Sequence, residues 1–127
     1  MINSAYQKYQ QTQAQTASKP KLLIMLYDGA IRFVQAGIEG ISELNYEKAN
    51  NNLCKAQAII HELISSLNFE YSISNDLVRI YEYMLDLLKK SNIQKQSLFA
   101  EEVVEHLREL REAWFGATKQ VGAGFGV

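Results

Sequence analysis

Residues 18–42 read SKPKLLIMLYDGAIRFVQAGIEGIS, and this stretch decides the fold. Wound as a helix with about 100° between successive residues, it places four polar side chains on one narrow stripe: Asp28, Arg32, Gln35 and Glu39. Almost all its other side chains are apolar, so we expect burial on most sides. Ser18 suits the N-cap, and Pro20 suits the first turn, where a missing N–H costs nothing. The pattern predicts the central helix of an all-α bundle.

Glycines inside this stretch need a separate explanation. Gly29 and Gly37 should each destabilise a helix by about 1 kcal/mol relative to alanine. A helix that retains such residues usually uses the missing side chain to admit a close neighbour. We therefore expect another element to approach this helix closely at its glycines.

Three further helices are predicted, over about 46–67, 76–90 and 97–119. Each repeats apolar side chains at helical spacing, and Asn45 is the expected N-cap of the first of them. Polar connections over 68–75 and 91–96 separate these helices. Helices of this length joined by short loops predict an antiparallel four-helix bundle over residues 18–119.

The predicted helix over 76–90 carries more apolar surface than bundle packing obviously needs. Its apolar arc spans about 220°, whereas a bundle helix usually buries a stripe somewhat over 100° wide. Three apolar residues lie along one edge of this arc: Ile80, Tyr83 and Leu87. That edge of the helix is a candidate binding surface.

The two ends of the chain differ in composition from the predicted bundle. Residues 1–17 are rich in Gln, Thr and Ala and carry Tyr6 and Tyr9 three positions apart. This arm is either a solvated terminus or a short helical segment that docks through its two rings. Residues 120–127 are rich in glycine, and we expect them to be disordered.

Composition limits the classes of function that the chain is suited to. The chain has 127 residues, 47% hydrophobic content and a net charge of −1. A chain without a basic excess is a poor candidate for nucleic acid or for anionic membrane surfaces. The N-terminal residues lack the apolar segment of a signal peptide, and no apolar run approaches the ~20 residues of a membrane span. We expect a cytoplasmic protein without membrane insertion.

No catalytic or metal-binding constellation is visible. Carboxylate-bridged metal sites in bundles need Glu-x-x-His on two helices, and neither His61 nor His106 has a glutamate three positions earlier. Glu102 and His106 are four apart and are expected to form a surface pair. Cys54 is the only cysteine, which excludes an internal disulfide. We therefore expect no enzyme activity, no metal and no cofactor.

What remains is apolar surface, for which three interpretations stay open. It is core, a groove for a partner's amphipathic segment, or a homodimer interface. Methionines such as Met25, together with the tyrosines, would suit adaptable packing against a partner. The pattern alone does not choose between these interpretations.

Several motifs resemble the FliS family of flagellar export chaperones. They include AYQKYQ over 5–10, TAS over 16–18, MLYDGAIRF over 25–33 and ELREAW over 109–114. The resemblance spans about residues 5–119. One departure is Lys19, which separates the capping serine from the proline that commonly follows it directly in the family.

The resemblance implies an antiparallel helical bundle without enzyme activity that binds the disordered C-terminal region of flagellin. Binding in apolar grooves would prevent premature polymerisation and keep flagellin ready for export. The export-gate membrane protein would recognise the loaded complex, and flagellar regulators or a co-chaperone are further possible partners. The tyrosine-bearing arm would act as a lid over a groove. Candidate flagellin-binding residues are Tyr6, Tyr9, Met25, Tyr27, Ile59, Ile80, Tyr83 and Leu87.

Two competing functions remain at this stage. One is a helical adaptor or homodimeric interaction module without flagellin specificity. The other is a metal-dependent bundle enzyme, which elemental analysis of the purified protein would test.

Overall fold

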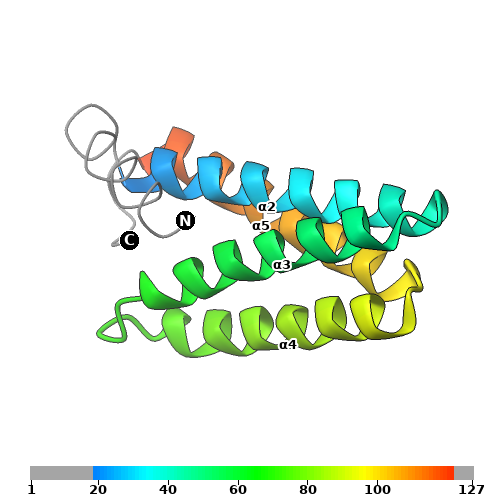
Figure 1. Cartoon of the computed structure of the whole chain (residues 1–127). Coiled ribbons are helices and arrows are strands. Elements are labelled where there is room, and N and C mark those ends of the chain that lie inside the picture. The colour runs from blue at the N-terminus through cyan, green and yellow to red at the C-terminus, as the bar shows by residue number, and fades with distance from the viewer. Residues whose placement is uncertain (1–18, 122–127) are drawn as a thin grey trace.

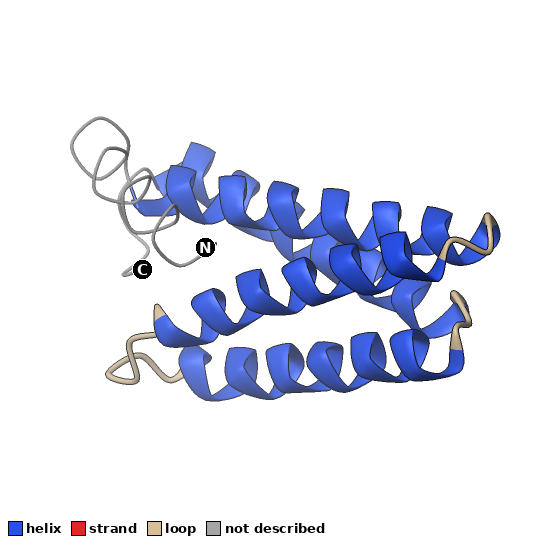
Figure 2. Cartoon of the chain, viewed as in Figure 1, coloured by secondary structure: helices blue, strands red, loops and turns tan. Residues whose placement is uncertain are grey.

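The computed structural model describes residues 19–121, which form helices and no strand. The helices are α2 (Lys19–Ser42), α3 (Tyr46–Ser65), α4 (Ile73–Gln94) and α5 (Leu98–Val121) (Figure 1, Figure 2). They run up and down in alternation, each packs against its sequence neighbours, and α5 returns beside α2. The predicted all-α four-helix bundle is therefore confirmed. The predicted arm, residues 1–17, and most of the predicted tail, residues 120–127, lie outside the described residues.

The glycines of α2 explain how closely α3 approaches it. A Cβ atom on Gly37 would lie 2.6 Å from Cγ and Cδ2 of Leu53, and one on Gly40 would lie 2.6 Å from the backbone nitrogen of Ala49. Both distances are too short for real side chains. Figure 1 shows α2 and α3 drawing together toward their shared turn. The expected close neighbour is therefore α3.

The core is one contiguous cluster to which all four helices contribute. Its largest fully buried side chains are Tyr27, Val34, Leu53, Ile60, Leu63, Tyr81, Met84, Leu88, Val103 and Leu107. Trp114 of α5 is also buried, with 4% of its surface exposed. Burial of this set supplies the apolar driving force for the bundle.

Two predicted connections differ from the structure. α4 runs to Gln94, so the predicted loop over 91–96 is wrong in its first half. The polar side chain of Ser91 is buried because its hydroxyl accepts the N–H of Ala100 at 2.7 Å. At the other end α4 begins at Ile73, three residues earlier than predicted. Helix α3 instead ends at Ser65, two residues before the predicted end.

The turns at one end of the bundle use left-handed residues. Among residues 19–121, two non-glycine residues have positive φ, Leu44 at 59° and Lys95 at 54°. After α2, the N–H of Asn45 bonds to the carbonyl of Gly40 at 2.8 Å and that of Leu44 bonds to Ile41 at 3.1 Å. This is a Schellman cap, in which glycine usually occupies the place of Leu44. Asn45 also caps α3 as predicted, accepting the N–H of Lys48 at 3.1 Å.

Candidate functional site

Tyr27 lies in the centre of the bundle, away from its surface. Its hydroxyl is 2.5 Å from the hydroxyl of Tyr81 and accepts a hydrogen bond of 3.0 Å from Nε1 of Trp114. Burial raises the pKa of both phenols, so both stay neutral. A side chain with 0% exposure offers no surface to a partner. In this conformation Tyr27 is therefore a packing residue, and its contact with a partner stays a prediction.

Leu87 and Ile59 are also buried, with 4% and 8% of their surfaces exposed. The wide apolar arc of α4 is needed because α4 packs against α3 on one side and α5 on the other. Contact with two neighbouring helices buries a wider part of the α4 surface than the single stripe expected from the sequence. Leu87 and Ile59 are consequently core residues in this conformation.

Three of the other candidates keep accessible surface. Met25 and Ile80 are partly buried, and Tyr83 is 47% exposed. Tyr83 reaches across to α5, where its hydroxyl donates to Oε2 of Glu102 at 2.7 Å. Its ring also meets the ring of His106 edge-on at 6.0 Å between centroids. Tyr6 and Tyr9 lie outside the described residues.

A hollow of about 610 Å³ lies beside these contacts on α5. Its lining residues all come from the first half of the helix: Leu98, Phe99, Glu101, Glu102, Glu105 and His106. Phe99 is partly buried, and the ammonium of Lys90 on α4 lies 5.8 Å from the centre of its ring. We call this the outer hollow of α5.

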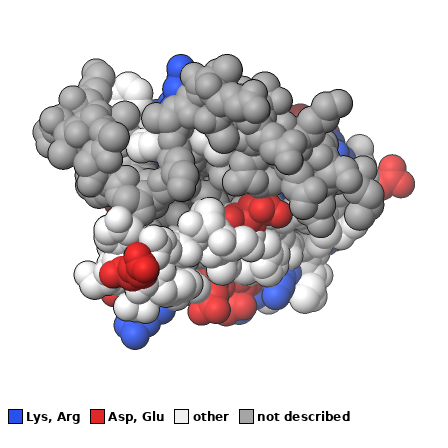
Figure 3. Space-filling model, turned by 90° about the vertical axis from the view of Figure 1, so that its left-hand side faces the viewer, with Lys and Arg blue, Asp and Glu red and all other residues white. Residues whose placement is uncertain are grey.

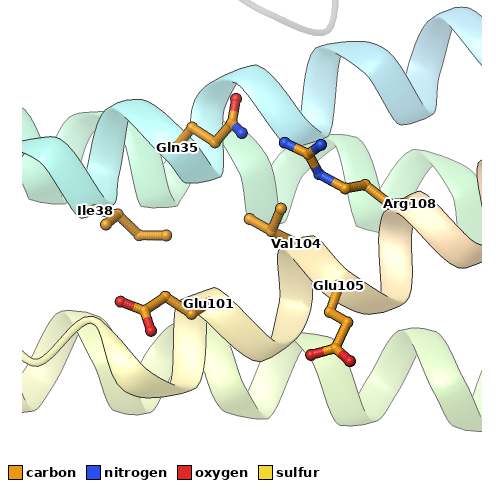
Figure 4. A pocket seen from close by; sticks show the side chains of 6 residues that line it. All are labelled: Gln35, Ile38, Glu101, Val104, Glu105 and Arg108. Carbon is orange, nitrogen blue, oxygen red and sulfur yellow. The ribbon is translucent and has the colours of Figure 1, made fainter.

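A second hollow, of about 390 Å³, lies between α2 and α5. Figure 4 shows Ile38 of α2 and Val104 of α5 between the two helices, with Gln35 and Arg108 toward one rim. Glu101 and Glu105 complete the lining and belong to the outer hollow as well. We call this the inner hollow. The first half of α5 is thus a ridge with a hollow on each side.

The carboxylates of this ridge give it an acidic character. Hydrogen bonds from His106 and Tyr83 hold the pKa of Glu102 below its usual range. The hydrogen bond between Tyr83 and Glu102 also raises the pKa of the Tyr83 hydroxyl. His106 Nε2 lies 3.0 Å from Oε2 of Glu102, as expected for the predicted surface pair. The apolar floors of the two hollows suit the apolar face of an amphipathic segment.

Farther along α5, Arg111 forms an ion pair with Asp28 of α2. Its Nε lies 2.5 Å from Oδ1 of Asp28, and a second guanidinium nitrogen lies 3.4 Å from Oδ2. Asp28 is one of the few polar residues of α2, and this contact explains its place on the predicted polar stripe. The ion pair joins α2 and α5 beyond the inner hollow.

The apolar floor of the inner hollow was missed by sequence reasoning. Val104 follows the buried Val103 and lies just beside the core stripe of α5, and Ile38 holds the same position on α2. An apolar residue immediately beside a core stripe on two facing helices is the signal that could have found this floor.

The end of the bundle that carries the α3–α4 connection exposes large apolar side chains. Figure 3 views that end, where white described surface lies between scattered acidic and basic side chains. Phe69, Tyr71 and Ile73 in and after the α3–α4 connection are between 46% and 55% exposed. This surface lies away from the α5 ridge.

Neither a metal-binding cluster nor a membrane-spanning helix is found among the described residues. Residues 19–121 contain no group of three His, Cys, Asp or Glu side chains placed to hold a metal ion. None of the four described helices has an apolar stretch that could cross a bilayer. Cys54 is exposed, 3.7 Å from Oδ1 of Asn50.

The sequence model of one family, described as flagellar protein FliS, matches residues 1–121. The chain belongs to the FliS family. It is 34% identical over 113 residues to the flagellar secretion chaperone FliS of Bacillus subtilis, covering 89% of this chain and 85% of the relative. The FliS of Campylobacter jejuni is 32% identical over 114 residues, covering 88% and 89%. The FliS of Vibrio cholerae is 30% identical over 113 residues, covering 87% and 83%. Membership in the FliS family supports a flagellar export chaperone role.

Proposed function

We propose that this FliS-family protein is a cytoplasmic chaperone of flagellin that binds the disordered C-terminal region of its substrate. The observation that carries the proposal is the α5 ridge, with an apolar-floored hollow on each side. Each hollow has room for a few side chains of a bound segment. The segment would fold into helices as it binds along the ridge.

The energetics of such binding favour apolar hollows over a polar surface. A disordered segment loses conformational entropy when it orders, and buried apolar area must offset that loss. Ile38 and Val104 supply such area in the inner hollow, and Leu98 and Phe99 supply it in the outer one. Covering the apolar face of flagellin in this way would prevent premature polymerisation.

Export would begin when this protein passes flagellin to the export gate, and that transfer requires no chemical step. The protein would act without enzyme activity, metal or cofactor, and the export-gate membrane protein would receive flagellin from the loaded complex. Tyr6 and Tyr9 of the arm would cover a groove until flagellin arrives. Flagellar regulators or a co-chaperone are further partners consistent with this role.

Calorimetric titration with the C-terminal segment of flagellin from the same organism tests the proposal. We expect near one-to-one binding with a negative heat-capacity change, because apolar surface is buried. Val104→Glu should weaken this binding at least tenfold, since it places a carboxylate on the apolar floor. Asn51→Glu is the matched control: it adds the same charge at an exposed position of α3.

Two results would contradict the proposal. The first is absence of binding by the flagellin segment, which would favour a helical adaptor with a different partner. The second is equal binding by Val104→Glu and the unaltered protein, which would move the site away from the inner hollow. Circular dichroism of both variants separates loss of binding from loss of fold.

A further inference from the structure

The inner hollow has one positively charged side chain directed along its rim. Figure 4 shows Arg108 extending from α5 toward Gln35 on α2, beside Val104 on the apolar floor. The carboxylate of Glu105 points from α5 in the other direction, away from Gln35. The polar groups at this rim are therefore a guanidinium and an amide.

The bundle itself engages neither of these two groups. Within residues 19–121, the guanidinium of Arg108 and the amide of Gln35 form no hydrogen bond and no ion pair. Two carboxylates lie within helical reach of Arg108, three positions before it and four positions after it. Glu105 points away, and Glu112 lies 3.4 Å from a guanidinium nitrogen of Arg111. Arg108 is consequently available to a bound segment.

Binding of a segment in the inner hollow changes the surroundings of Arg108. A chain that covers Ile38 and Val104 also removes water from the exposed guanidinium beside them. A buried charge without a partner is costly, and a guanidinium can only donate hydrogen bonds. A carboxylate on the segment would supply the opposite charge and two acceptors in the geometry that suits arginine. The amide of Gln35 can donate to the same carboxylate.

The rest of the α5 ridge disfavours a carboxylate. Glu101 and Glu105 line both hollows, and Glu102 lines the outer one. An acidic side chain of a bound segment would be repelled along most of the ridge and attracted at the Arg108 end of the inner hollow. One acidic residue of the segment would thus determine its register along α5.

We propose that Arg108, assisted by Gln35, binds an acidic side chain of the flagellin segment and thereby sets its register on α5. This inference rests on the function proposed above, because it names the contact that places flagellin in the inner hollow. Arg108 and Gln35 are then the residues of specificity, whereas Ile38 and Val104 supply apolar contact.

Calorimetric titration with altered flagellin segments tests this contact. Each aspartate or glutamate of the C-terminal segment is replaced in turn by asparagine or glutamine. We expect one of these replacements to weaken binding to the unaltered protein at least fivefold. Arg108→Gln should weaken binding of the unaltered segment by a similar factor. The two changes together should cause no further loss, because both remove the same contact.

A charge exchange gives a second readout, which a purely structural role of Arg108 would not produce. Arg108→Glu should weaken binding of the unaltered segment more than Arg108→Gln does. Lysine at the identified acidic position of the segment should restore binding to Arg108→Glu at least fivefold. Circular dichroism of both variants checks that the helices are intact.

Arg32→Gln is the matched control on α2. It removes the same charge from an exposed arginine, whose Nη2 lies 3.9 Å from where a Cβ of Gly29 would lie. Arg32 is not among the residues that line the inner hollow. Binding of every segment by Arg32→Gln should stay within twofold of that by the unaltered protein.

Two results would overturn the proposal. The first is full-strength binding of the unaltered segment by Arg108→Gln, which would show that Arg108 turns aside into water when the hollow is covered. The second is additive losses at every acidic position, which would show that no carboxylate of the segment meets Arg108. Flagellin still binds in both cases, so the proposed function stands. Absence of binding by the unaltered protein would instead overturn that function and this inference together.

Discussion

The hydroxyl of Tyr27 lies between Tyr81 and Trp114 at the centre of the bundle. Removing it in Tyr27→Phe leaves the buried Tyr81 hydroxyl without this partner. We expect a loss of about 1 to 3 kcal/mol in the free energy of unfolding, measured by urea denaturation. Tyr83→Phe removes an exposed hydroxyl and is the control, with a much smaller expected change. Equal losses in the two variants would contradict the packing role of Tyr27.

Glu102 makes a second residue-level prediction, concerning protonation. The hydrogen bond from His106 is the largest cause of its lowered pKa, so His106→Ala should raise that pKa toward the ordinary range of glutamate. Carboxyl chemical shifts recorded by NMR across a pH titration measure it. An unchanged midpoint in His106→Ala would assign the lowered pKa to Tyr83 instead.

The same contact sets a direction for stability against pH. The pKa of Glu102 is lower in the folded protein than in the unfolded chain, so the contact stabilises the fold fully above the unfolded pKa. That contribution is lost as the pH falls through the folded pKa. His106→Ala should therefore flatten the dependence of stability on pH in the acidic range.

At the level of elements, the pairing of α2 with α3 depends on glycine. Alanine is the better helix former by about 1 kcal/mol, so propensity alone predicts that Gly→Ala stabilises. At Gly40 the new methyl group would meet the backbone of Ala49, which cannot move independently of α3. We expect Gly40→Ala to destabilise by about 1 to 3 kcal/mol.

Gly116 of α5 offers a control for this prediction. A Cβ there has nothing within 4 Å, so Gly116→Ala should stabilise by about 0.5 to 1 kcal/mol. Thermal unfolding of the two variants should thus shift in opposite directions. Shifts of the same sign would show that helix propensity, and not interhelical distance, decides the effect at Gly40.

On the scale of the whole molecule, periodicity was enough to predict the bundle. The stripe on residues 18–42 and the apolar repeats downstream identified four helices, because burial of one face repeats with the helical period. The ends of α4 were harder to predict. Ser91 looks like a loop residue until Ala100 supplies its partner, and that contact depends on tertiary structure.

The candidate site could be predicted less well than the fold. Leu87 and Tyr27 looked available because a helical wheel does not show how many neighbours a helix has. Val104 was not singled out at all, because its place in a hollow depends on how α2 and α5 are positioned. The family could be identified from motifs, whereas the surface requires the helices to be placed in space.

The pairing of α2 with α5 has a consequence for how the chain folds. The other helix pairs with extensive contact join neighbours along the sequence, but Asp28 and Arg111 meet across 83 positions. Closing so long a loop costs entropy before any contact is gained, so this seam should form after the α2–α3 hairpin. In stopped-flow experiments, Trp114→Phe should therefore speed unfolding and leave the folding rate almost unchanged, whereas Leu53→Val should slow folding. A folding rate that falls as much in Trp114→Phe as in Leu53→Val would show that the seam is already closed at the transition state.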